Sequence, residues 1–189
     1  MASRVAAVGE RRMARVAWPD AVVVAMVGAL ALALLMRNPG PARMLYAGAG
    51  AGVLTWIALY DVRTLRAPNR VVYPAIGALL LGSTVLGLSA AASAVGGAAL
   101  SFGFFLVIAM IGRGAMGFGD AKVAAVAGAS VGLGGLVPML LATHLAGMLV
   151  ASVALGFRLR SRNDVVAYTP FLLLGVVAAT WVAPTVGPS

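Results

Sequence analysis

The chain contains no cysteine among its 189 residues and only one histidine, His144. The missing thiols exclude disulfides, cysteine nucleophiles and zinc–cysteine sites, and one imidazole is too few for a histidine-based metal site. We therefore expect no bound metal and no cofactor. Charged side chains are also scarce, because Asp, Glu, Lys and Arg make up 10% of the residues, against about 25% in an average soluble domain.

Apolar residues are abundant. They make up 62% of the chain, and the mean hydropathy is +1.02. A helix needs about 20 apolar residues to cross a bilayer, and the runs lack the alternation of membrane-barrel strands. The sequence predicts an all-α, polytopic membrane bundle of about seven transmembrane helices. The runs are 21–36, 42–60, 71–88, 92–111, 121–135, 137–157 and 165–182.

Basic residues are concentrated on one side of this predicted bundle. If the N-terminus is cytoplasmic, twelve of the fourteen basic residues fall in inner segments, and only Arg37 and Arg43 fall outside. This distribution follows the positive-inside rule. Since the basic residues are scattered between apolar segments, membrane lipid is an expected partner and nucleic acid is not.

The first apolar run follows a basic N-terminal stretch, an order that is also typical of signal peptides. The run is long for a signal peptide, however, and no small-residue cleavage site follows it. We predict a basic cytoplasmic segment over 1–20, a retained N-terminal span and loop over 21–41, the main transmembrane domain over 42–182 and a short tail over 183–189.

Only five residues are acidic, and three of them have simple explanations. Asp20 and Asp164 each precede an apolar run, where helix N-caps are expected, and Glu10 lies in the polar N-terminal stretch. Asp61 and Asp120 lie at the edges of predicted spans, where an ionisable group is costly and suggests a function. Two complete crossings separate them, so both are expected at the cytoplasmic boundary.

Each of these two acids also has a structural interpretation. Pro68-Asn69, after Asp61, would break one helix and start the next, and Asp120 would cap its helix after a glycine-rich loop. That loop has more glycine than a cap needs, which favours clearance for a substrate. Lys122 could tune the acids, contact substrate, or simply face anionic lipid. We interpret His144 as a hydrogen-bonded interior residue.

Taken together, Asp61 with Pro68-Asn69 and the later Gly117-Phe118-Gly119-Asp120-Ala121-Lys122 resemble the paired signatures of type IV prepilin peptidases. These are polytopic aspartic proteases with a Gly-x-Gly-Asp motif, and the resemblance covers roughly 42–182, a six-helix core after one additional span. It implies that the chain removes leader peptides from pilin-like precursors at the cytoplasmic face of the cell membrane. The implied catalytic pair is Asp61 and Asp120, and the implied supporting residues are Gly117, Gly119, Lys122, Pro68 and Asn69.

The chain also departs from the family pattern. Many members carry a cysteine-containing zinc domain and methylate the new N-terminus, so the lack of cysteine indicates a peptidase-only form. The late Pro-Phe-Gly-Pro segment of the family is only partly matched by Ala167-Tyr168-Thr169-Pro170-Phe171.

Two neighbouring carboxyl groups can share a proton and activate water. Asp120 is predicted at a helix N-terminus and Asp61 at a helix C-terminus, so the helix dipole favours Asp120 as base and Asp61 as acid. A small ion-coupled carrier, an inactive pilus-assembly scaffold and a protease that cuts within membrane helices stay open as alternatives. The sequence does not predict an oligomeric state.

Overall fold

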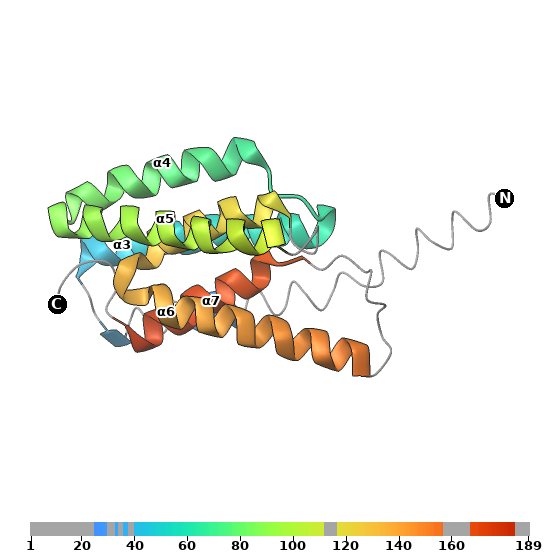
Figure 1. Cartoon of the computed structure of the whole chain (residues 1–189). Coiled ribbons are helices and arrows are strands. Elements are labelled where there is room, and N and C mark those ends of the chain that lie inside the picture. The colour runs from blue at the N-terminus through green and yellow to red at the C-terminus, as the bar shows by residue number, and fades with distance from the viewer. Residues whose placement is uncertain are drawn as a thin grey trace.

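The computed structural model describes residues 25–29, 33, 36–37, 40–111, 117–156 and 167–183. Regular structure in these residues is helical throughout, which confirms the predicted all-α class. The helices with defined bounds, drawn in Figure 1, are α3 (Pro41–Thr64), α4 (Asn69–Val85), α5 (Leu88–Ile111), α6 (Phe118–Gly156) and α7 (Thr169–Val182). The predicted 1–20 segment, most of the 21–36 span, Asp164 and residues 184–189 of the tail lie outside the described residues.

Among the residues that the structure describes, three stretches are long and apolar enough to cross a membrane: α3, α5 and the Phe118–Val153 part of α6, while α7 is shorter. Large apolar side chains point outward from these helices, and Leu88 at the start of α5 is 87% exposed. Such surface is stable only against lipid or another apolar partner. The chain is therefore a membrane protein by the length and composition of its helices, and the seven predicted crossings are not confirmed.

The long helix α6 contains one sharp break, at Gly132, whose backbone angles of φ 65° and ψ −169° are not helical. Glycine adopts this positive φ without a side-chain clash. The yellow first part of α6 and its orange second part run in roughly opposite directions on either side of the break (Figure 1). The sequence predicted two separate runs here, with their boundary a few residues later, at Leu136.

Small residues bring α5 and α6 together next to this break. A Cβ atom on Gly97 would lie only 2.9 Å from the carbonyl carbon of Gly132, so the two backbones are in contact. Ser101 of α5 donates a hydrogen bond to the Ala124 carbonyl oxygen of α6 (2.7 Å), and Ser93 accepts one from the Leu133 amide (2.9 Å). These contacts fix α6 against α5, as small residues and short hydroxyls do in membrane bundles.

The core lies between the helices and consists of buried side chains from α3, α4, α5, α6 and α7. Its largest members include Leu54, Ile57, Phe105, Met139 and Leu172. At one end of the bundle, the Arg37 guanidinium donates to the carbonyl oxygens of Trp181 (2.6 Å) and Ala183 (3.0 Å). A cation at this position satisfies carbonyl groups that α7 leaves open at its C-terminus.

Gly97→Ala should destabilise the bundle, because its Cβ atom would meet the backbone of α6. Overpacking of this kind costs about 1–3 kcal/mol, so we expect the melting temperature of the purified protein to fall by several degrees. Gly103→Ala is the matched control on the same helix, since nothing lies within 4 Å of its added Cβ. Equal melting temperatures for the two variants would contradict the close α5–α6 contact.

Candidate active site

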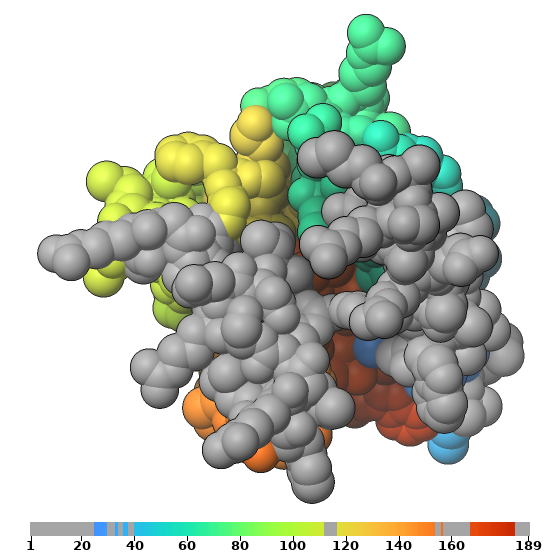
Figure 2. Space-filling view, turned by 90° about the vertical axis from the view of Figure 1, so that its right-hand side faces the viewer, coloured from blue at the N-terminus to red at the C-terminus, as the bar shows by residue number. Residues whose placement is uncertain are grey.

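Four helix ends converge at one end of the bundle: the end of α3 and the starts of α4, α6 and α7 (Figure 1). Viewed from that end, green residues of the α3–α4 link and α4 lie beside the yellow start of α6, and red residues of α7 lie below them (Figure 2). The local sequence explains the α3–α4 link. Leu65 ends α3 in the left-handed conformation, and Pro68 is the N-cap of α4, as the sequence predicted for Pro68-Asn69.

Asp61 lies in the last turn of α3 and is only 5% exposed. Its Oδ2 atom accepts two hydrogen bonds from Thr169, one from the backbone N–H (3.2 Å) and one from the side-chain hydroxyl (2.8 Å). Thr169 is the first residue of α7, so the carboxylate faces a helix N-terminus, a favourable place for an anion. A hydrogen bond to a charged group contributes about 1.5–3 kcal/mol.

Asp120 lies in the first turn of α6 and is partly buried. Its Oδ2 atom accepts a hydrogen bond from the Gly117 N–H (3.1 Å), and its own N–H donates to the Gly117 carbonyl oxygen (3.1 Å). The bond to Oδ2 is one half of a capping box, the half in which a side chain in the first turn accepts from the N–H before the helix. The interpretation of Asp120 as a helix cap is therefore correct, although it does not account for the second acid nearby.

The two acids lie at the same end of the bundle, because Asp61 is near the end of α3 and Asp120 is near the start of α6. Each has its Oδ2 atom occupied by a backbone N–H from the start of a helix, Thr169 for Asp61 and Gly117 for Asp120. The other oxygen of each acid, Oδ1, does not accept a hydrogen bond from that N–H group. The sequence suggested that the helix dipole would distinguish Asp120, at a helix N-terminus, from Asp61, at a helix C-terminus. The structure removes this difference, because Asp61 also faces a helix N-terminus, that of α7.

The two sequence motifs also meet through Lys122 and Asn69. The Lys122 ammonium donates to the Asn69 side-chain oxygen (3.1 Å) and lies 5.1 Å from the centre of the Tyr73 ring. A cation–π contact of this kind contributes about 0.5–1 kcal/mol at an exposed site. Lys122 thus joins the first turns of α6 and α4 beside the two acids.

The motif glycines Gly117 and Gly119 are not required by the backbone. Neither has a positive φ. A Cβ on Gly119 would lie 3.5 Å from the Ala67 Cβ, and one on Gly117 would lie 3.6 Å from Asp120 Oδ2, both ordinary contact distances. The fold would accept alanine at either position, so clearance for a bound molecule stays the prediction for these glycines. Gly112 and Gly114 lie outside the described residues.

Aromatic rings pack behind the acids. Tyr168, directly before α7, contacts Phe105 (ring centres 5.6 Å apart) and lies 6.3 Å from the His144 ring. His144 Nδ1 lies 2.7 Å from the Leu140 carbonyl oxygen, which confirms a hydrogen-bonded interior histidine. Burial, and then the Asp120 carboxylate, raise the pKa of Tyr168 to about 12.

The sequence did not single out Thr169 or Tyr73. Thr169 lies in the segment that only partly matches the family pattern, and the last helix was predicted to begin at Val165. That start is wrong, because Ala167 and Tyr168 are not helical and α7 begins at Thr169. The available signal was Thr169-Pro170, since proline is favoured in the first turn of a helix.

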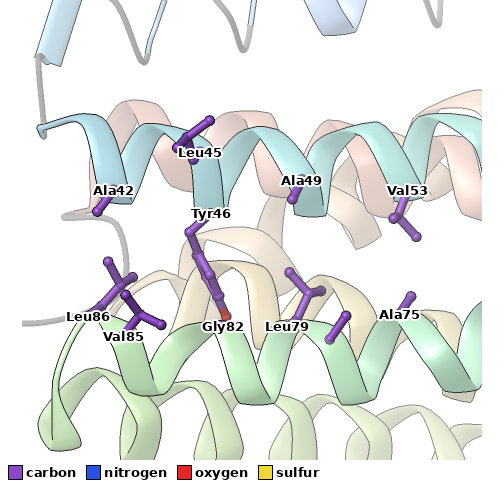
Figure 3. A pocket seen from close by; sticks show the side chains of 11 residues that line it. Ala42, Leu45, Tyr46, Ala49, Val53, Ala75, Leu79, Gly82, Val85 and Leu86 are labelled. Atoms are coloured by element: carbon purple, nitrogen blue, oxygen red, sulfur yellow. The ribbon is translucent and has the colours of Figure 1, made fainter.

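An apolar cavity of about 310 Å³ lies between α3 and α4, mostly toward the other end of these helices. Figure 3 shows side chains such as Leu79 and Val53 around it, with Tyr46 crossing from α3. The Tyr46 hydroxyl is already used, because it donates to the Ala129 carbonyl oxygen (2.8 Å). The cavity therefore lacks groups for hydrolysis, and the convergent helix ends are the candidate active site.

A family model described as the type IV leader peptidase family matches residues 48–152, more than half of the chain. The chain belongs to this family. No curated protein and no solved structure matches it. Membership supports a peptidase that acts on the leader peptides of prepilin-like proteins, and the resemblance found in the sequence is confirmed.

The matched range of this peptidase includes Asp61 and Asp120 together with Asn69 and Lys122. It ends before α7. The contact between Asp61 and Thr169 therefore joins the matched part of the peptidase to a helix that the match does not include.

The raised pKa of Tyr168 predicts a late ionisation of this side chain. Because burial disfavours the phenolate, Tyr168→Phe should remove almost no tyrosinate absorbance below about pH 11, a full unit under the pKa of about 12. Asp120→Asn should lower the ionisation midpoint, since it removes a nearby negative charge. Loss of a titration step near pH 10 in Tyr168→Phe would contradict the burial of this ring.

Proposed function

We propose that the chain is a membrane-embedded aspartic endopeptidase that removes leader peptides from pilin-like precursors at the cytoplasmic membrane face, for pilus biogenesis. Asp61 and Asp120 form its catalytic pair. One observation carries the proposal: two acids from separate helices, distant in sequence, lie at the same end of an otherwise apolar bundle, Asp61 in the last turn of α3 and Asp120 in the first turn of α6. Family membership supports the substrate class.

The proposed chemistry uses one proton shared between the two acids. Like charges at short distance disfavour double ionisation, so one carboxyl group is neutral and the other is charged. The charged group takes a proton from water as the water oxygen bonds to the peptide carbonyl carbon. The neutral group donates its proton toward the developing oxyanion or the leaving nitrogen, and the carbon–nitrogen bond breaks.

The surrounding residues have supporting roles in this proposal. Lys122 and Asn69 hold the first turns of α6 and α4 together, which keeps the helix that carries Asp120 in register with the link after Asp61. Gly117 is exposed, and neither it nor Gly119 carries a side chain. The peptide backbone of a substrate can therefore approach Asp120 closely on this side.

The proposed topology has seven crossings, with the N-terminus in the cytoplasm and the site on the cytoplasmic side of the plasma membrane. The helix directions support it, because the α3–α4 link and the start of α6 lie at the same end (Figure 1), and the break at Gly132 supplies a reversal within α6. The α3–α4 link contains Arg66, and the helix ends beside it contain Arg63 and Arg70. The turn between α4 and α5 has no basic residue.

A carrier is disfavoured by the position of the acids. Ion-coupled carriers bind their substrates near the bilayer midplane, at broken helices. The break in α6 is at Gly132, whereas Asp61 and Asp120 lie at helix ends. The two features are therefore separated along the bundle.

Asp61→Asn and Asp120→Asn should each abolish leader removal, because either change leaves one carboxyl group where two are needed. Loss of a general acid or base costs about 10²–10⁴-fold in rate. The measurement is the shift in size of a co-expressed pilin-like precursor, with Asp20→Asn and Asp164→Asn as matched controls. Cleavage that persists in both test variants would refute the catalytic pair, and no cleavage by the wild type would favour a scaffold or carrier.

Since the chain lacks cysteine, single cysteines can report its topology. A membrane-impermeant maleimide applied to right-side-out vesicles should label Leu88→Cys, at the start of α5, and should leave Arg66→Cys unlabelled until the vesicles are opened. The reverse pattern would invert the proposed orientation and place the acids outside.

A further inference from the structure

Thr169 is fully buried, and both of its hydrogen-bond donors point at a single oxygen atom, Asp61 Oδ2. It lies outside the range that the family model matches. A buried threonine hydroxyl in a helix commonly bonds to a carbonyl oxygen of the preceding turn, as Thr143 does to Met139 (2.7 Å). At the first position of α7 the hydroxyl of Thr169 bonds to the acid of another helix instead.

We propose that Thr169 is a positioning residue of the peptidase. It holds Asp61 Oδ2 from two directions, so that Oδ1 alone faces the proton shared with Asp120 and the hydrolytic water. The inference rests on the proposed function and adds to it the atom that reacts and the residue that selects it.

The hydrogen-bond donors around the acids explain why Oδ1 is the reacting oxygen of Asp61. A backbone N–H can only donate, so the oxygen that it faces has to accept and cannot carry a proton in that direction. Thr169 N–H occupies Oδ2 of Asp61, and Gly117 N–H occupies Oδ2 of Asp120. Asp61 Oδ2 also accepts from the Thr169 hydroxyl, so both of its lone pairs are used. A proton that the pair shares is therefore bound to Asp61 through Oδ1.

The position of Thr169 is itself fixed by its surroundings. The Phe171 N–H donates to the Tyr168 carbonyl oxygen (3.0 Å) to begin α7, and Leu172 and Leu173 are fully buried in the core. The Tyr168 ring packs against Phe105 and Phe171, with ring centres 5.6 and 5.7 Å apart. The donors of Thr169 are therefore presented by a packed helix start, as precise positioning requires.

The hydroxyl and the amide can be separated by substitution. Every residue except proline offers the N–H, whereas the hydroxyl is available only from threonine or serine among close replacements. Thr169→Val keeps the β-branched shape and the N–H and loses the hydroxyl. Thr169→Ser keeps both donors and loses one methyl group. The two variants form a matched pair.

In proteoliposomes that contain a pilin-like precursor, we expect Thr169→Val to lower kcat about tenfold, the loss of one hydrogen bond to a charged group, with KM within about twofold. Thr169→Ser should retain kcat within about threefold. A role in packing alone would give the opposite ranking, because valine preserves the shape of the side chain better than serine does.

A second measurement is independent of activity. Thr169→Val should lower the melting temperature by a few degrees when Asp61 is present and by less than about 1 °C in the Asp61→Leu background, because residues in contact are not additive. The same substitution at a hydroxyl that does not contact Asp61, Thr143→Val, should have an equal effect in both backgrounds.

Wild-type kcat in Thr169→Val, a Thr169→Ser variant no better than Thr169→Val, or equal melting shifts in both Asp61 backgrounds would each overturn the positioning role while leaving the catalytic pair intact. A wild type that does not cleave, or cleavage that persists in Asp61→Asn and Asp120→Asn, would overturn the proposed function and the role of Thr169 with it. The two failures are therefore distinguishable.

Discussion

A buried carboxylate must find hydrogen-bond donors, and in this membrane bundle the donors come from helix N-termini. Asp61 is held by the start of α7 and Asp120 by the start of α6. Because a lone ion in an apolar interior is strongly disfavoured, the end of α3 is stable in this form only while α7 begins beside it. This single requirement connects the middle of the chain to its last helix, and the candidate site depends on it.

The packing of α5 against α6 provides the geometry for that requirement. Gly97 lets the two backbones touch, and the break at Gly132 turns the second half of α6 back toward the end that carries the acids. The chain can then start α7 at that end. Without the reversal, the first turn of α7 and Thr169 would lie at the far end of the bundle from Asp61.

The polar groups of the candidate site lie at one end of the molecule, and the surface between the helix ends is apolar. Between the helix ends, the outward surface and the cavity between α3 and α4 are apolar, which suits contact with lipid. At the convergent end, the two carboxyl groups, Lys122 and Asn69 lie within a few residues of a helix end. This segregation is consistent with a peptidase whose substrate arrives at the membrane boundary, which the proposed function requires.

The sequence by itself determined the helical class, the apolar segments, the family and the two acids, because these depend on composition and on short local patterns. It also placed the α3–α4 break at Pro68-Asn69, since proline disfavours a helical conformation in the residue before it. Only the tertiary structure decided the partnership of Thr169 with Asp61 and the contact of Lys122 with Asn69. These pairings join residues from separate helices, and no local pattern encodes which helix ends will meet once small residues have set how closely the helices pack.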